Sequence, residues 1–402
     1  MNLNPGFILA IVALAAFAAP LVADRIGIPV AVVEILLGLG LSLMVPAQEH
    51  GNGTFIASLG TLGFIILMFL VGVELDLRQI WSGSKVGILA GILFTAVSLL
   101  FSILVLGKIA GASPLWILSG AAVSVGIAAP VLSSSGLLGS KFGHDLIVMG
   151  SVSEVLYILF LNGYAVSVNH SLHTSAVLVG LRTAGIITAT VLTGLVISLL
   201  RSRIPRHFQR WFRRDDPIQL GLRGTFLIMF FFVAVSSLVH IPDVLGALVA
   251  GVLFRTVMGN AKAIVERLSS IANSFFVPVF FITVGLNTVL RFGMVALLPR
   301  IGIVLVVLMV PRLTAIFYFV FLKHPLRNAT GGSLLLMAPL TMLITTAELG
   351  VSENVLSQLN ASTIVLTATL TGIVFPILAR GLLPHAKEAA GGQKQQEQPA
   401  AV

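Results

Sequence analysis

The sequence contains no cysteine among its 402 residues, and only 10% of those residues are charged. Without cysteine there is no disulfide framework, thiol nucleophile or cysteine metal site. Soluble domains carry about 25% charged residues, so a chain of this length with so few charges could not cover a water-exposed surface. These shortages exclude a secreted disulfide scaffold, a disordered chain and a cytosolic enzyme. The sequence is instead 57% hydrophobic, which indicates a polytopic membrane protein.

Long apolar runs predict the number of membrane-spanning helices. In lipid, backbone polar groups must be satisfied within the segment, so a run of about 20 apolar residues is read as a helix. About thirteen such runs are present, at residues 6–23, 28–45, 54–74, 85–108, 114–134, 143–167, 175–201, 219–240, 243–258, 271–292, 296–323, 331–349 and 361–384. We therefore expect an all-α membrane protein with about 13 transmembrane helices. The polar segment 386–402 is expected to be a disordered cytoplasmic tail.

Positive charge predicts the orientation. The chain has 24 Lys and Arg against 15 Asp and Glu, a net charge of +9. Six arginines fall between the seventh and eighth runs, namely Arg201, Arg203, Arg206, Arg210, Arg213 and Arg214. Because Lys and Arg accumulate in cytoplasmic loops, we expect an inner (plasma) membrane protein with its N-terminus outside and its C-terminus in the cytoplasm. Basic and aromatic residues do not interleave as in a single-strand binding groove, so lipid rather than nucleic acid is the expected partner.

Two pairs of segments match at the same offset of 213 residues. The matches are Ile28-Pro29 with Gly38 against Ile241-Pro242 with Gly251, and Val71-Gly72 with Leu77-Arg78 against Val284-Gly285 with Leu290-Arg291. This offset maps predicted helices 2–6 onto 9–13, and the odd separation of seven helices makes the two halves face opposite ways. We therefore predict inverted repeats at about 28–167 and 241–384, within one transmembrane domain over residues 1–385. Many secondary transporters have such repeats; chance similarity of small-residue patterns is the alternative.

The same offset pairs two unusual spans, 114–134 and 331–349. Each is rich in Gly, Ser or Thr, and each contains a proline, Pro130 or Pro339. Corresponding interrupted spans in two repeats are the best sequence indicator of a transporter binding site. An unwound turn frees carbonyls and helix ends that can hold a cation away from water. The alternative is a simple proline kink in each helix.

Two acidic residues, Glu34 and Glu154, lie well inside predicted spans. A charge at the bilayer centre costs at least ~2.5–3.5 kcal/mol, so each suggests a function. Glu154 lies about 13 Å along its helix from Asp145, near mid-membrane, where a proton and a small cation could compete for it. Its candidate charge partners are Arg312, midway along the eleventh run, and Arg182, nearer an outer end. Glu34 could instead cap a neighbour, and the Glu154 pairing could be a structural salt bridge.

Five segments in this order resemble the monovalent cation/proton antiporter superfamily, which includes bacterial Na+/H+ and Kef-type K+/H+ antiporters. The segments are ADRIGIPVAVVEILLGLGL (23–41), LGFIILMFLVGVELDL (62–77), SGLLGSKFGHDLIVMGSVSEVLYILF (135–160), LGALVAGVLF (245–254) and FFVPVFFITVGL (275–286). The resemblance implies a homodimer with a dimerisation domain and a mobile core domain. It also implies that the two discontinuous helices cross near the ion site.

The resemblance also assigns roles to individual residues. The family's ion-binding acid matches Glu154, and Ser153 stands where many relatives have an aspartate. Arg312 matches the intramembrane lysine of electrogenic members. The first interrupted helix has Val123, beside Ser124, in place of a common threonine. The second has Pro339-Leu340-Thr341 where many relatives have Arg-Gly-Glu.

Three functions remain open at this stage. The leading interpretation is a secondary-active antiporter, not an enzyme, that exchanges Na+ or K+ for H+ at Glu154, with no cofactor besides the transported ions. With one titratable carboxylate at the site, the exchange is expected to be electroneutral at 1:1. The first alternative is an organic-anion/sodium symporter of bile-acid-carrier-like architecture, and the second is a membrane sensor.

Overall fold

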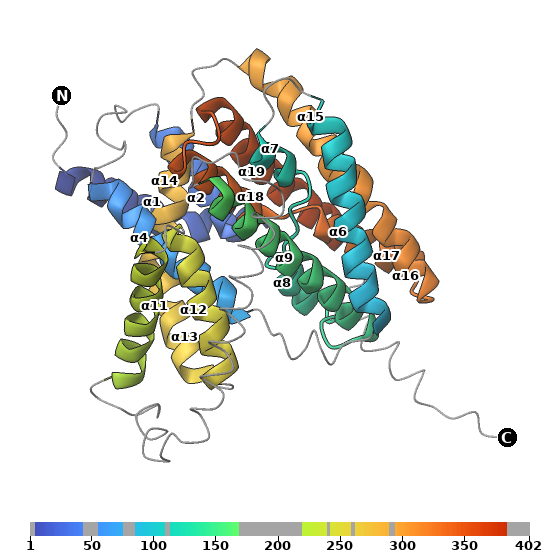
Figure 1. Ribbon diagram of the computed structural model, residues 1–402, viewed down its shortest axis with the longest axis horizontal. Coiled ribbons are helices and arrows are strands. Elements are labelled where there is room, and N and C mark those ends of the chain that lie inside the picture. Colours follow the sequence, from blue (N-terminus) through green and yellow to red (C-terminus); the bar gives the residue numbers. More distant parts are fainter. Residues whose placement is uncertain are drawn as a thin grey trace. The chain divides into compact units, whose positions relative to one another are not determined.

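The computed structural model describes residues 5–42, 55–74, 85–108, 113–168, 219–238, 242–258, 262–288 and 294–383, and every regular element in these ranges is a helix (Figure 1). The helices are α1 (Pro5–Ile26), α2 (Val30–Leu41), α4 (Phe55–Glu74), α6 (Lys85–Leu106), α7 (Pro114–Ser119), α8 (Ala128–Ser134), α9 (Lys141–Val168), α11 (Leu220–Leu238), α12 (Asp243–Met258), α13 (Lys262–Ile271), η2 (Ala272–Phe276), α14 (Val277–Asn287), α15 (Met294–Arg312), α16 (Thr314–Phe321), α17 (Leu326–Leu336), α18 (Leu340–Ser352) and α19 (Gln358–Leu382). Nine helical stretches in the described ranges are long and apolar enough to cross a membrane, and α2 is a shorter apolar helix. The chain is therefore an all-α, multi-pass membrane protein. The predicted run 175–201, Arg182, the arginine-rich segment and the tail lie outside the described residues.

The predicted span 271–292 begins too late. The helix starts at Lys262, because α13 continues through the π-helical turn η2 into α14. The sequence KAIVERLSSI of α13 is polar, so an apolar run cannot reveal it. The π turn precedes Pro278, whose ring nitrogen cannot donate to the carbonyl four residues earlier.

The described helices form two compact units, divided within α1, α2 and α9. The first unit contains α4, α11 to α14 and most of α1 and α2. The second contains α6 to α8, α15 to α19 and α9 as far as Phe160.

Close backbone contacts between glycines hold helices together in the first unit. A Cβ atom at Gly38 would overlap the carbonyl oxygen of Ile282, and one at Gly285 would overlap that of Ile35. This is the crossing of α2 with α14. A second crossing, of α4 with α12, joins Gly72 and Gly251 in the same way. Small residues allow such approach in lipid, where van der Waals packing drives helix association.

These two crossings involve the four glycines that the 213-residue offset relates. Gly38 corresponds to Gly251 and Gly72 to Gly285, so exchanging the members of each pair turns one crossing into the other. A two-fold relation between the repeats requires this exchange. The inverted repeat over the whole chain stays a prediction, and these crossings support it at four positions.

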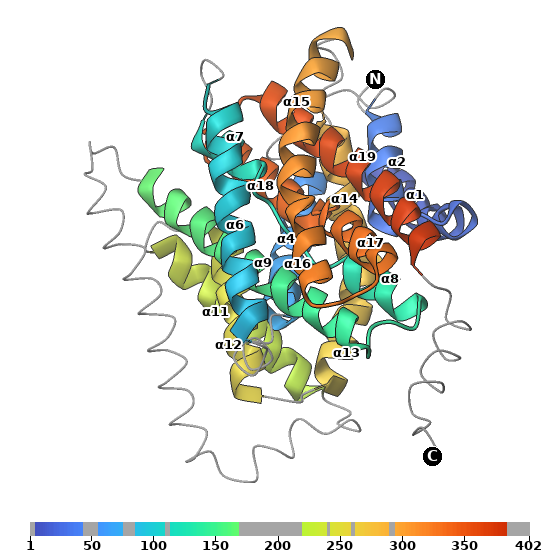
Figure 2. The same cartoon turned by 90° about the vertical axis from the view of Figure 1, so that its right-hand side faces the viewer.

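The core of the second unit is an apolar cluster to which several helices contribute. Its buried cluster takes side chains from six helices, including Phe94, Leu132, Phe142, Phe319, Leu336 and Ala379. In Figure 2, α6 runs beside α15, with which it is in contact. This core includes α8 and α17, which are one half of each of the two interrupted helices, α7–α8 and α17–α18.

Two glycines of α2 give a matched test of the crossings. Gly38→Ala should lower the free energy of unfolding by about 1–3 kcal/mol, because the new methyl group would force two backbones apart. Gly40→Ala should be neutral or stabilising, because a Cβ there meets nothing within 4 Å and alanine favours helix. Thermal unfolding in detergent would measure both; equal stability of the two variants would contradict the close crossing.

Candidate ion-binding site

The two predicted interruptions are present and they meet. In the first, α7 ends at Ser119 and α8 begins at Ala128, with residues 122–125 in no regular structure. In the second, α17 ends at Leu336 and α18 begins at Leu340. The hydroxyl oxygens of Ser124 and Thr341 lie 3.0 Å apart. The unwound segment of the first helix is therefore in contact with the first turn of α18, where the second interrupted helix restarts.

Pro130 and Pro339 lie at different positions relative to the interruptions of their helices. Pro339 lies in the second interruption, as predicted, and is the N-cap residue of α18. Pro130 is exposed and lies in the first turn of α8, where a missing N–H is tolerated. The first helix is therefore interrupted before Pro130 and not at it, which corrects the predicted position.

Arg312 joins the carbonyl ends of both interrupted helices. Its guanidinium donates to the Leu336 carbonyl at 3.2 Å, to that of Gly120 at 3.2 Å and to that of Ala122. A fourth bond, 2.6 Å long, goes to Leu308 in its own helix. The last carbonyls of a helix have no partner within it and carry partial negative charge, so this buried cation offsets the cost of interrupting both helices. Its predicted direct pairing with Glu154 stays a prediction.

Glu154 faces the same unwound segment. Its carboxylate oxygen Oε2 accepts a hydrogen bond of 3.2 Å from the backbone N–H of Val125, and its side chain is buried. One turn earlier on α9, Gly150 allows this approach, because a Cβ there would overlap the Val125 side chain and crowd that of Leu336. The carboxylate is thereby brought beside the point where Ser124 and Thr341 meet.

Two predicted site residues are occupied elsewhere. The Ser153 hydroxyl lies 3.1 Å from the Gly91 carbonyl of α6 and 2.9 Å from the Met149 carbonyl of its own helix α9. Its hydrogen bonds therefore join α9 to α6 and do not reach the interruption. Val123 belongs to the buried apolar cluster. Glu34 is buried on α2 and belongs to the first unit, whereas Glu154 belongs to the second. The roles of Ser153, Val123 and Glu34 in ion binding stay predictions.

The sequence analysis missed two groups near the interruptions. Buried Tyr157, one turn after Glu154, is hydrogen-bonded to Thr346 of α18. Glu348 was placed at the end of a span, but α18 continues to Ser352. Glu348 lies seven residues after Thr341, on the same face of α18 and about 10 Å further along it. The polar residue at a helical spacing from Thr341 was the available signal, once the restart of the helix at Leu340 was known.

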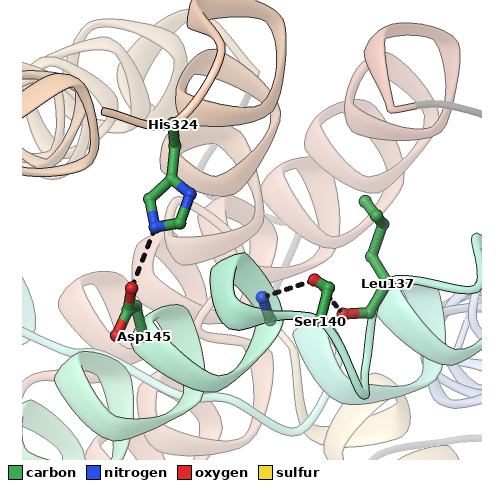
Figure 3. Close-up of polar contacts among 5 residues, drawn as sticks. Leu137, Ser140, Asp145 and His324 are labelled. Atoms are coloured by element: carbon green, nitrogen blue, oxygen red, sulfur yellow. Dashed lines mark hydrogen bonds and ion pairs between the residues drawn. The ribbon is translucent and has the colours of Figure 1, made fainter. Parts of the chain in front are cut away.

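A part-buried hydrogen bond between two side chains fixes the other end of α9 (Figure 3). Asp145 Oδ2 lies 2.8 Å from Nε2 of His324, which follows α16. The rings of Phe142 and Phe319 pack edge-on against His324. At the start of α9, Ser140 accepts from the Gly143 N–H and donates to the Leu137 carbonyl. The helix that carries Glu154 is thus tied to the one that follows Arg312.

Comparison with known proteins identifies the family of the chain. The family described as "Sodium/hydrogen exchanger, transmembrane" matches residues 11–383. The chain belongs to this sodium/hydrogen exchanger family. Membership supports the superfamily that the five segments resemble and gives no support to an organic-anion symporter. It is a family of membrane transporters.

The individual relatives share about a quarter of their aligned residues with the chain. The putative Na(+)/H(+) antiporter YjbQ of Bacillus subtilis (strain 168) is 27% identical over 404 residues, which cover 93% of the chain and 62% of that protein. The Na(+)/H(+)-K(+) antiporter GerN of Bacillus cereus is 25% identical over 65% of the chain and 66% of its own length. The chain thus spans about two thirds or less of these two relatives.

A solved structure shares the fold. The sodium proton antiporter MjNhaP1 from Methanocaldococcus jannaschii at pH 8 superposes with a TM-score of 0.64, covering 94% of this chain and 98% of that one. The sequence identity is 15%, so this likeness concerns the fold alone.

Replacement of Arg312 tests the carbonyl clamp, by which we mean the hydrogen bonds from its guanidinium to the carbonyl ends of the two interrupted helices. Arg312→Met would leave buried carbonyls of two interrupted helices without a donor and should lower the free energy of unfolding by about 3 kcal/mol or more. Arg312→Lys keeps the charge but not the planar set of donors and should fall between. Arg300→Met is the control, because Arg300 on the same helix is half-buried and hydrogen-bonds the Asn360 side chain. Similar thermal unfolding of both Met variants would contradict the clamp.

Proposed function

We propose that this exchanger is a secondary-active antiporter that moves Na+ or K+ in exchange for H+ by alternating access. The observation that supports this most directly is the buried Glu154 carboxylate beside the two meeting interruptions. A single carboxylate cannot bind a proton and a cation together at full strength. Competition between them at Glu154 would couple their movements in opposite directions.

The remaining ligands of the cation would be uncharged oxygens. Ser124 and Thr341 present hydroxyls where the first interruption meets the start of α18, and the carbonyls of Val123 and Ser124 lie in the unwound segment. The neighbouring carbonyls already accept hydrogen bonds, that of Ala122 from Arg312 and that of Val125 from the Ala129 N–H. Hard cations such as Na+ and K+ prefer oxygen ligands of this kind. Few charged ligands would favour a weakly held ion, so the site suits either cation. No resident cofactor is needed in this mechanism.

Assembly and orientation are part of the same proposal. We propose a homodimer in the plasma membrane, with the N-terminus outside and the C-terminus in the cytoplasm. Helix α1, with Ala15, Ala16, Ala18 and Ala19, is proposed to lie at or near the subunit interface. Ala15 packs inside the subunit, so the opposite face with Phe7, Leu14 and Phe17, which are exposed, would contact the partner. The unit that holds the site would move with its bound ion.

Removal of the Glu154 charge is the primary test. Glu154→Gln keeps the size of the side chain but can neither release a proton nor neutralise a cation, so exchange should be abolished. The assay is the dissipation of a proton gradient in everted vesicles on addition of Na+, K+ or Li+. Glu266→Gln, which removes an exposed carboxylate from α13, should exchange at the wild-type rate. Wild-type exchange by a folded Glu154→Gln variant would refute the site.

The stoichiometry gives a second test. Arginine stays protonated at any usable pH, so Arg312 cannot supply a second proton, and each cation bound at Glu154 should release one proton. A 1:1 exchange moves no net charge. An imposed membrane potential of either sign should therefore leave the rate in proteoliposomes almost unchanged. An exchange rate that changes with the imposed membrane potential would require a second titrating group. Loss of that voltage dependence in Glu348→Gln would identify this group as Glu348.

A further inference from the structure

We infer that Tyr157 and Thr346 are positioning residues for the ion site, which hold the carboxylate helix α9 in register with the second interrupted helix. The inference rests on the proposed role of Glu154. Neither hydroxyl is a ligand in this scheme. Their effect on transport comes from fixing where Glu154 lies relative to Thr341.

The hydrogen bond between them joins helices that are far apart in sequence. Tyr157 and Thr346 are both fully buried, and the two hydroxyls are in direct contact. Thr346 donates its own proton to the Met342 carbonyl at 2.8 Å. Its oxygen can then only accept from tyrosine, so the Tyr157 hydroxyl is the donor. The direction of the bond is therefore fixed by the backbone of α18.

This bond lies close to the site along the axes of both helices. Tyr157 is three residues after Glu154 on α9, and Thr346 is five residues after Thr341 on α18. On an α-helix these separations are about 4.5 Å and 7.5 Å along the axis. A shift of α9 along α18 would therefore break this bond before it displaced more distant contacts.

A cation site formed by a carboxylate and neutral oxygens depends on such support. Its ligands come from separate chain segments, and binding weakens when any ligand moves by a fraction of an ångström. Without the bond, the Glu154 carboxylate would be free to move away from Ser124 and Thr341. The first property to change would be the affinity for the cation, while the rate at saturating cation would change less.

The experiment compares matched tyrosine and threonine variants in proteoliposomes. Tyr157→Phe and Thr346→Val each remove one partner, and each should raise the KM for Na+ or K+ about three- to tenfold, the value of one hydrogen bond. The maximal rate per folded protein should stay within about twofold of wild type. The double variant should be no worse than either single one, because both remove the same interaction. Thr346→Ser restores a hydroxyl and should recover most of the affinity.

The chain supplies two controls. Tyr318→Phe removes a buried hydroxyl that has no hydrogen-bond partner in the described part of the chain. Thr367→Val removes one that donates to the Thr363 carbonyl of its own helix. Both controls should keep the wild-type KM. A purely structural role of Tyr157 would lower the amount of folded protein and the maximal rate at an unchanged KM, and that result would overturn the inference.

Glu154→Gln, measured in the same series, separates the inference from the proposed site. If Glu154→Gln is inactive and Tyr157→Phe has the same KM as Tyr318→Phe, the positioning role is refuted and the ion site stands. If Glu154→Gln exchanges normally, the ion site is refuted and the positioning role with it. Raised KM in both Tyr157→Phe and Thr346→Val, with an inactive Glu154→Gln, would support both.

Discussion

The interruption of two helices inside a membrane sets the central constraint on this structure. Each interruption leaves carbonyl groups without helical partners, and lipid offers no water to satisfy them. Arg312 meets the requirement for both helices at once, through carbonyls at Leu336, Gly120 and Ala122. A planar guanidinium with several fixed donors can serve acceptors from separate segments, whereas an ammonium group offers three donors at a single point. The proposed ion site depends on this one side chain, because it stabilises the opened backbone.

The same arrangement explains how charge could be kept constant during transport. Arg312 contributes a fixed positive charge that is balanced by carbonyl dipoles. Glu154 contributes a single negative charge that a proton or a monovalent cation can neutralise. The two loaded forms then have equal net charge, so the moving unit experiences the same electrostatic cost with either ion. Electroneutral exchange would follow from the presence of one titrating group at the proposed site and would not require the two ions to share ligands.

The sequence was informative where one helix alone decides the outcome. Apolar runs located most spans, and the Gly, Ser, Thr and Pro content of 114–134 and 331–349 indicated which two are interrupted, because each signal lies within a short segment. It failed where packing decides. The polar sequence of α13 is helical because it continues into α14. The first interruption was predicted at Pro130, which is wrong because a proline can begin a helix as well as break one. The Tyr157–Thr346 bond joins residues 189 apart, and no periodicity could have paired them before the restart of α18 was known.

Different interactions stabilise the interior of each of the two units. The first uses glycine crossings, in which backbones touch and few polar groups need partners. The second depends on hydrogen bonds to unwound backbone, from Arg312 and Glu154. Packed glycine crossings have one arrangement, because any displacement opens a gap or creates an overlap. Hydrogen bonds to free carbonyls and N–H groups can be exchanged for bonds to an ion. The first unit is therefore suited to serve as a rigid scaffold, and the second to bind and release ions without losing its fold.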